Sequence, residues 1–324
     1  MSLSHVSVDI LIGRLQQLGW TVSQHSDSGK NMVKFQKNNF VWETPRTIVH
    51  YPCIEDHFRS IVADKLRCQK IAHEIGVTVP ETTAFDAPVY DKKVLQRLID
   101  TYKVVVVKPD NSRGSAGLTI GPQNPQSLFA AIDAALQIKN CRMALVQKFY
   151  TGSEYRFTIL NGKVVSVIER QKPNVIGDGV SRIVELIAAE NKQRHAINKF
   201  SLLTYPDITD KDAKDEQRIP KRGEKVQLGD STMVRRGASL YEVIGNVHTS
   251  YCTLAESLAQ KIPLYFLTVD MLIEDIFQPA RSDNYCFLEA NSAPSLAMYD
   301  STRNNQNMDV IARLVQKIDK FSDT

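Results

Sequence analysis

The order of apolar and polar positions along the chain predicts several amphipathic helices. In three segments, apolar side chains recur every three or four residues, which places them on one face of a helix. These segments are residues 8–18, 64–75 and 128–136. Gly19 and Gly76 follow the first two, and glycine in that position is a common helix stop signal. The chain therefore opens with a helix and carries at least two more.

Short runs rich in β-branched and aromatic residues predict strands between these helices. Two hairpins are expected, one pairing residues 32–35 with 40–42 and one pairing 156–160 with 163–168. Asn161-Gly162 joins the second pair and is a strong two-residue turn signal. Further strands are expected at residues 47–51 and 144–147, and the charge-rich, apolar-poor stretch 207–225 predicts an exposed loop.

Four valines at 104–107 form an apolar run that ends in Lys108 and Pro109. Such a run suits a strand covered on both faces, and proline ends it because it cannot donate to a sheet ladder. The small residues from Ser112 to Gly117 let the backbone bend, so that several N–H groups point into one anion-binding concavity. Leu118-Thr119-Ile120 continues as a strand, which predicts a hairpin loop over phosphates and not a Walker loop. Taken alone, the segment also fits a glycine-rich hairpin whose lysine extends to solvent.

Composition narrows the class of protein. At 324 residues and 43% hydrophobic content, the chain can form two or three packed units. It shows no signal segment and no bilayer-length apolar run, which predicts a cytoplasmic protein with no membrane contact. Five scattered cysteines predict free thiols. The net charge of +4 is small and evenly mixed, which argues against nucleic acid as a partner and fits either a small anionic ligand or simple solubility.

Several longer motifs occur in a fixed order. They are Asp64-Lys65 before Gly76-Val77-Thr78-Val79-Pro80, Val107-Lys108-Pro109, Val146 to Tyr150, and Gly152-x-Glu154-Tyr155-Arg156. The most specific runs from Pro173 to Gly179, includes Asp178, and continues through Ile183, Glu185-Leu186-Ile187, Asn191 and Arg194. A turn before an amphipathic helix explains only part of that pattern. From about Asp64 to about Tyr299 the chain resembles an ATP-grasp ligase, and it is most similar to cyanophycin synthetase and the ligase part of bifunctional glutathione synthetases.

The resemblance implies an α+β ATP-grasp fold, in which two α+β lobes sandwich ATP, preceded by a small α/β N-terminal unit. The implied boundaries are 1–62 for that unit, 63–145 for the first lobe with its phosphate loop, and 146–324 for the second lobe with the hinge, metal site and substrate loop. The implied nucleotide-binding residues are Lys108, Ser112, Gly114, Ser115, Ala116 and Gly117 at the phosphates, Gln147, Lys148, Phe149 and Tyr150 at the adenine, and Glu154 at the ribose. Gln147 stands where glutamate is more usual.

The resemblance also implies a magnesium site at Asp270, Glu289 and Asn291. Glu289 and Asn291 stand at i and i+2 of a predicted strand, so both side chains emerge on one face, and Asp270 on a neighbouring strand could complete the site. Mg²⁺ prefers such oxygen ligands together with substrate phosphates. The alternatives are a polar strand face for the pair and a surface carboxylate for Asp270.

The implied activity is amide formation through an acyl phosphate, with small-molecule carboxylate and amine substrates, ATP, and Mg²⁺ or Mn²⁺. Amino acids or small peptides are the expected substrates, and homodimer formation is left open. Positioning and charge stabilisation are expected to perform the phosphoryl transfer, without a protein nucleophile.

Two departures set this chain apart from the pattern. Gly229 stands where relatives carry an arginine, whereas Arg235 and Arg236 occupy a loop that is small and polar in relatives. Either of these arginines could contact the acyl phosphate from a displaced position, or both are solvated, and Arg170 is a further cation expected at the site. Ala297-Met298-Tyr299 also departs from the family's Met-His ending. The alternative function is therefore a nucleotide-binding regulatory or scaffold protein with weakened or lost ligase activity.

Overall fold

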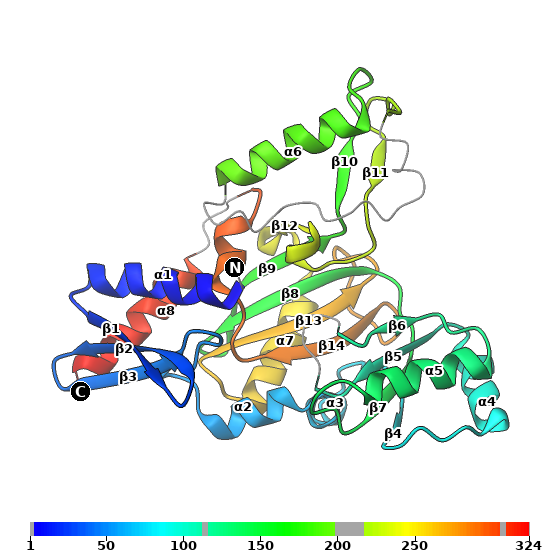
Figure 1. Ribbon diagram of the computed structural model, residues 1–324, viewed down its shortest axis with the longest axis horizontal. Coiled ribbons are helices and arrows are strands. Elements are labelled where there is room, and N and C mark those ends of the chain that lie inside the picture. Colours follow the sequence, from blue (N-terminus) through cyan, green and yellow to red (C-terminus); the bar gives the residue numbers. More distant parts are fainter. Residues whose placement is uncertain (1–2, 112–115, 198–216, 305–308, 324) are drawn as a thin grey trace.

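The computed structural model describes residues 3–111, 116–197, 217–304 and 309–323. Within them the strands form four sheets, of three, four, five and two strands. Figure 1 shows the N-terminal part at the left, the four-stranded sheet at the lower right, and the two-stranded sheet projecting at the top. Every strand pairing is antiparallel, which matches the α+β class expected from the sequence.

The N-terminal part is a helix followed by a three-stranded meander. Its elements are α1 (Leu3–Gln17), β1 (Thr21–Asp27), β2 (Lys30–Lys37), β3 (Phe40–Pro45) and the short helix α2 (Asp56–Ala63). The predicted helix and hairpin are confirmed. The strand predicted at residues 47–51 is wrong, because the chain turns there. The Thr44 hydroxyl donates to the Ile48 carbonyl and accepts from the His50 amide, which holds the turn in place of a sheet ladder.

The first lobe is a four-stranded sheet with two helices on one face. Its elements are α3 (Lys65–Glu74), β4 (Thr82–Phe85), α4 (Lys92–Tyr102), β5 (Val105–Pro109), β6 (Thr119–Ile120), α5 (Pro125–Leu136) and β7 (Ala144–Lys148), with strand order β4-β7-β5-β6. Val105 and Val107 are buried against Leu128 and Ile132 of α5. The expectation that the valine run is covered on both faces is wrong. Val104 is 44% exposed, and Val106 lines a cleft on the face that the helices leave open.

The second lobe is a five-stranded sheet of order β12-β9-β8-β13-β14. Its strands are β8 (Ser153–Leu160), β9 (Lys163–Gln171), β12 (Ser239–Glu242), β13 (Phe266–Ile273) and β14 (Tyr285–Asn291). The helical elements around it are η1 (Val234–Arg236), η2 (Ile244–Asn246), α7 (Thr249–Lys261), η3 (Leu296–Ser301), α8 (Val310–Asp319) and η4 (Lys320–Asp323). The hairpin predicted at Asn161-Gly162 is confirmed, with both glycine and asparagine at positive φ.

A small arm projects from this lobe. It comprises β10 (Asn174–Ile176), α6 (Ile183–Ile197) and β11 (Lys225–Gln227), and has its own apolar cluster around Ile183 and Val226. The long signature that begins at Pro173 therefore encodes the arm. Asp178 accepts hydrogen bonds from the Val180 and Ser181 amides, which stabilise its charge and lower its pKa to about 2. Of the predicted loop 207–225, residues 207–216 lie outside the described residues, 217–224 form no helix or strand, and Lys225 begins β11.

The N-terminal part shares its core with the second lobe. Leu11 and Leu15 of α1 belong to the same buried cluster as Phe266 of β13 and Leu314 of α8. The Ser7 hydroxyl also accepts from the Leu296 amide, which ties α1 to η3. The domain boundaries remain a prediction, and the one after residue 145 falls inside β7.

Candidate active site

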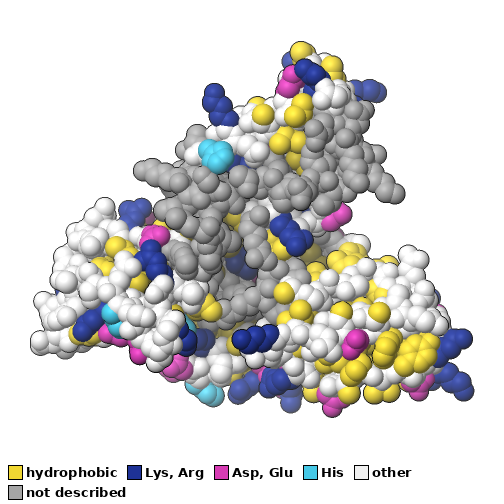
Figure 2. Space-filling model, in the orientation of Figure 1, with side chains coloured by type: hydrophobic (Ala, Val, Ile, Leu, Met, Phe, Trp, Pro, Cys, Tyr) yellow, Lys and Arg dark blue, Asp and Glu magenta, His cyan; other side chains and the backbone are white. Residues whose placement is uncertain are grey.

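A cleft of about 2080 Å³ lies where the first lobe, the second lobe, the arm and the N-terminal part meet. Figure 2 shows the molecule hollowed between these parts, with Lys and Arg side chains in and around the hollow. The cleft brings together most of the site residues predicted from the sequence. Those that line it are Lys108, Gln147, Lys148, Phe149, Tyr150, Glu154, Arg170, Arg236, Asp270, Glu289 and Asn291.

The remaining predicted residues are placed differently. Ala116 and Gly117 are not among the residues that line the cleft, and neither is Asp178, which sits in the turn of the arm. Ser112, Gly114 and Ser115 lie outside the described residues. Arg235 lies in η1, and its side chain is also outside the described part of the chain.

Two lysines form one wall of the cleft. Lys108 extends from β5, and burial lowers the pKa of its ammonium group to about 8, although the nearby Glu289 carboxylate acts in the opposite direction. Lys65 begins α3, and its Nζ lies 3.9 Å from Oε2 of Glu289. The sequence interpretation used Lys65 only as part of a motif and did not assign it to the site. Its position directly after Asp64, at the start of a predicted helix within a family motif, was the available signal.

An ion-pair bridge fixes the start of that helix against the four-stranded sheet of the first lobe. Asp64 caps α3 by accepting from the Arg67 amide. Arg142 reaches Asp64 at 3.0 Å and the buried Asp110, which directly follows β5, at 3.3 Å. The bridge therefore connects the chain next to Lys65 with the chain next to Lys108.

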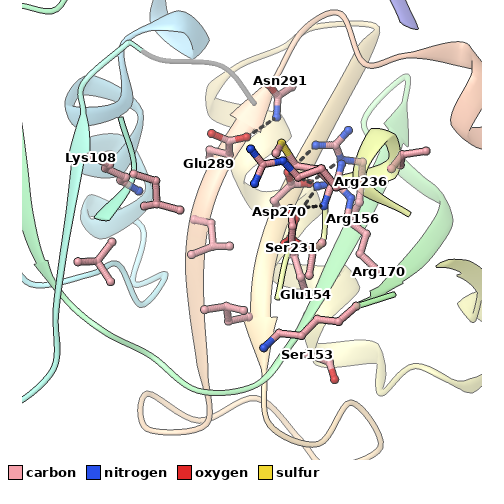
Figure 3. Close-up of a pocket in the computed structure, with 18 of the residues that line it drawn as sticks. Lys108, Ser153, Glu154, Arg156, Arg170, Ser231, Arg236, Asp270, Glu289 and Asn291 are labelled. Atoms are coloured by element: carbon pink, nitrogen blue, oxygen red, sulfur yellow. Dashed lines mark hydrogen bonds and ion pairs between the residues drawn. The ribbon is translucent and has the colours of Figure 1, made fainter. Parts of the chain in front are cut away.

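Glu289 and Asn291 face the cleft from the end of β14 (Figure 3). Nδ2 of Asn291 donates to Oε1 of Glu289 over 3.3 Å, and Asp270 of β13 lies directly opposite Glu289 in the sheet register. Directly paired residues have Cβ atoms about 5 Å apart, so the three side chains share one face. The Glu289 carboxylate with the amide oxygen of Asn291 fits Mg²⁺, which is commonly held by one or two carboxylates plus substrate phosphates. Among the described residues there is no cluster of three His, Cys, Asp or Glu side chains arranged for a metal.

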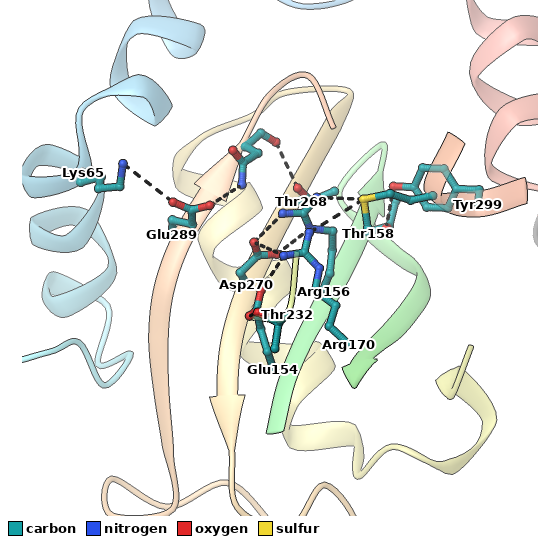
Figure 4. A network of polar contacts seen from close by, with 12 residues as sticks. Lys65, Glu154, Arg156, Thr158, Arg170, Thr232, Thr268, Asp270, Glu289 and Tyr299 are labelled. Atoms are coloured by element: carbon teal, nitrogen blue, oxygen red, sulfur yellow. Dashed lines mark hydrogen bonds and ion pairs between the residues drawn. The ribbon is translucent and has the colours of Figure 1, made fainter. Parts of the chain in front are cut away.

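Asp270 is already engaged by an arginine (Figure 4). Nε and Nη2 of Arg156 donate to its two oxygens at 2.7 and 2.5 Å, and both side chains are nearly inaccessible. Burial opposes ionisation of Asp270, but Arg156 and Arg170 hold its pKa below the ordinary value. Sequence reasoning assigned Arg156 no role at the site, because its partner lies 114 residues further along the chain.

A second ion pair involves the residue expected to bind ribose. Oε1 of Glu154 accepts from Nη1 of Arg170 at 2.5 Å, and its other oxygen accepts from the Thr232 hydroxyl. The remaining donors of the two arginines are poorly satisfied. Nη1 of Arg156 and Nη2 of Arg170 both point to the thioether of Met298, a weak acceptor, at 3.3 and 3.8 Å, and Nε of Arg170 is buried without a hydrogen-bond partner. The two guanidinium groups therefore have N–H donors left that can bind a further anion.

The hinge, residues 147–150, joins the two lobes. The Gln147 amide group donates to Thr82 at 2.7 Å and to Gln69 at 3.3 Å, so its side chain braces the first lobe. The backbone amides of Lys148 and Phe149 donate to the carbonyls of Glu81 and Val104. Those two amides are therefore not free for adenine.

Gly229, where an arginine is missing, lines the cleft on the segment between β11 and η1. Arg236 lines the same cleft and is exposed, while Arg156 and Arg170 reach it from the sheet. Positive charge is thus present in this part of the cleft without a side chain at position 229.

Comparisons with known proteins agree with this architecture. The bifunctional glutathione synthetase of Pasteurella multocida superposes with a TM-score of 0.66 over 96% of this chain and 44% of its own, at 20% identity. The chain therefore has the ATP-grasp fold, which confirms the predicted fold class.

Sequence comparison confirms the resemblance to bifunctional glutathione synthetases and cyanophycin synthetases. The chain is 27% identical over 249 residues to the glutathione biosynthesis bifunctional protein GshAB of Clostridium perfringens, covering 74% of this chain and 32% of that protein. It is also 27% identical over 252 residues to the cyanophycin synthetase of a Synechocystis species, covering 74% and 28%. The chain thus spans about a third of the length of these relatives. No family model matches it. Among the described residues, no helix is long and apolar enough to cross a membrane.

Proposed function

We propose that this chain is an ATP- and Mg²⁺-dependent ligase that joins a carboxylate to an amine through an acyl phosphate and releases ADP. The substrates we propose are amino acids or small peptides. The observation that carries the proposal is the composition of the cleft, which has two lysines on one wall and, on the other, Glu289 and Asn291 beside Arg156 and Arg170.

In this proposal the first wall binds the nucleotide phosphates. Lys108 and Lys65 supply positive charge, and the ion-pair bridge through Arg142 fixes their spacing. A phosphate between them raises the pKa of the Lys108 ammonium and keeps it charged. Mg²⁺, when bound by Glu289 and Asn291, would screen the charge of the phosphates during transfer.

The second wall orients the carboxylate that attacks. Asp270 holds the Arg156 guanidinium through two hydrogen bonds, and Glu154 holds that of Arg170. The remaining N–H groups, now directed at Met298, can donate to the substrate carboxylate and then to the transferred phosphoryl group. An arginine donor fixed in this way needs little reorganisation as charge develops, and one such donor contributes about 3–4 kcal/mol elsewhere.

The resemblance to known ligases supports this reading, because the named relatives form amide bonds in glutathione and cyanophycin synthesis. The alternative is a nucleotide-binding scaffold without turnover. Gly229 favours that alternative, as does the internal engagement of Glu154 and Asp270, which leaves fewer groups for ribose and metal.

Release of ADP from ATP distinguishes the two. The protein is incubated with Mg²⁺, ATP and pairwise mixtures of amino acids, and ADP is measured against ATP alone. A ligase gives ADP only with a matching acid and amine, and Lys108→Met abolishes the increase, whereas Lys93→Met on the exposed face of α4 does not. The same low ADP level in every mixture, with ATP still bound, would establish the scaffold instead.

A further inference from the structure

A second depression, of about 450 Å³, lies at the end of the second lobe's sheet that is remote from the cleft. It is formed by the β8–β9 turn, by Tyr265 ahead of β13, and by α8, which Figure 1 shows on the opposite side of the molecule from the four-stranded sheet. Of its nine lining residues, four are cations and none is acidic. We call it the basic groove, after Lys163, Arg313, Lys317 and Lys320.

Three of these cations lie on one face of the C-terminal helix. Arg313, Lys317 and Lys320 stand at i, i+4 and i+7 along α8 and the turn that follows it. None of the three forms an ion pair with a carboxylate among the residues that the structure describes. Asp319, their acidic neighbour, accepts instead from Lys37 and Trp20. Lys163 enters from the β8–β9 turn and pairs with Glu256 at 2.8 Å.

The central lysine is positioned by aromatic rings. Nζ of Lys317 lies 5.3 Å from the ring centroid of Tyr265 and 5.2 Å from that of Phe321. Cation–π contacts of this kind hold an ammonium group in place without neutralising its charge. The Lys317 ammonium is therefore oriented before any anion arrives.

Helix stabilisation alone does not account for this arrangement. Cations in the last turn of a helix interact favourably with its dipole, which explains Lys317 and Lys320. Arg313 lies a full turn earlier, however, and like charges at i and i+4 repel each other. Lys163 comes from a different element and faces the same depression. Convergence of cations from two elements is what binding of a multiply charged anion requires.

We infer that the basic groove is a binding site for a small phosphate-bearing anion, separate from the nucleotide cleft. Phosphate carries close to two negative charges at neutral pH, which matches several unpaired cations, and arginine binds it through two parallel hydrogen bonds. The side-chain amides of Asn161 and Gln316 and the Tyr265 hydroxyl supply neutral donors around the rim. A volume near 450 Å³ is within the range of small-molecule sites.

The groove is connected to the cleft through one strand. Leu160 of β8 lines the groove, and Glu154 and Arg156 of the same strand line the cleft. Arg156 lies four residues from Leu160, which in a strand spans about 13 Å. No residue lines both the groove and the cleft, so a ligand in the groove does not touch the nucleotide site.

The test is the number of pyrophosphate ions bound by the full chain, measured by isothermal titration calorimetry in 150 mM NaCl. We expect Lys317→Met to remove one binding event and Arg313→Gln to weaken the same event about tenfold, the effect of one charge-assisted hydrogen bond. Lys108→Met leaves that event intact, because Lys108 belongs to the cleft. Lys92→Met, at an exposed lysine of α4, is the matched control for loss of one surface charge and leaves all binding unchanged.

Two further measurements make the result decisive. Displacement of pyrophosphate from the Lys108→Met protein by ribose 5-phosphate indicates an organic phosphate, and displacement by inorganic phosphate alone indicates the free ion. Unchanged melting temperatures of the groove variants exclude misfolding. The inference is overturned if Lys317→Met binds as many pyrophosphate ions as the wild type, or if Lys92→Met lowers binding by the same amount.

Discussion

The buried ion pair between Asp270 and Arg156 predicts a large loss of stability when the carboxylate is neutralised. In Asp270→Asn the Arg156 guanidinium stays buried but loses its counter-charge, and because the new NH2 group cannot accept, at most one of the two hydrogen bonds, at 2.7 and 2.5 Å, remains. The two side chains are only 2% and 7% exposed, so water cannot replace the lost partner. Removing one member of a buried pair costs about 3–5 kcal/mol.

The matched control is Asp230→Asn, which removes the same charge at the surface. Asp230 is 81% exposed and lies 3.5 Å from Nζ of Lys172. Exposed pairs contribute less than about 1 kcal/mol, so this substitution changes stability little. Both variants replace an aspartate by asparagine, so they differ only in whether the ion pair that is broken is buried or exposed.

The assay is urea unfolding followed by tryptophan fluorescence. Trp20 and Trp42, the chain's two tryptophans, belong to the same apolar core as Val269 and Met271, which flank Asp270 in β13, so their signal reports this region. We expect a clearly lower unfolding midpoint for Asp270→Asn and recovery of much of the loss in the apolar pair Arg156→Met with Asp270→Leu. Equal midpoints for Asp270→Asn and Asp230→Asn would refute the reasoning and leave Asp270 free to act chiefly as a metal ligand.

Two other predictions concern the lysine wall and the backbone at Gly152. The pKa of Lys108 is lowered to about 8, so its positive charge is lost as pH rises through that value. We therefore expect the affinity for metal-free ATP, measured by calorimetry, to fall between pH 7 and 9 in the wild type. In Lys108→Arg the affinity should not change over this range, because arginine stays charged. A flat wild-type profile would contradict this assignment. Gly152 has φ +129, and a Cβ there would lie 2.8 Å from backbone atoms of Ile273, so Gly152→Ala should lower the melting temperature by several degrees, equivalent to about 1–3 kcal/mol. Gly13→Ala, inside α1 with open space around it, should instead raise stability slightly, and the opposite ranking of the two would refute the argument.

The sequence predicts elements well where one face is buried. Helix α5 and the β8–β9 hairpin follow from apolar periodicity and the Asn161-Gly162 turn. Strand β1 was not predicted because six of its seven side chains are exposed, which leaves no alternation to detect. The Val104–Val107 run was read as doubly covered because the sequence cannot show that an open cleft lies over one face of the sheet.

The contacts within the site were less predictable, and the β8–β9 register shows why. Counting outward from the two-residue turn pairs Glu154 with Glu169, two like charges. A bulge between Thr158 and Ile159 shifts the register by one, so that Glu154 faces Arg170 and forms an ion pair with it. A second irregularity, between Asp270 and Met271, sets Asp270 opposite Glu289. Neither bulge contains a proline or glycine, so the sequence carries no signal from which it could have been predicted.

The central claim, that this cleft activates a carboxylate with ATP, is tested most directly by trapping the acyl phosphate with hydroxylamine. Hydroxylamine replaces the unknown amine, so only the acid has to be supplied, from a panel of amino acids and dipeptides with Mg²⁺ and ATP. We predict that at least one acid yields its hydroxamate together with an equal amount of ADP, and that Lys108→Met and Arg156→Lys each suppress the product. Bound ATP without hydroxamate from any acid would contradict the claim.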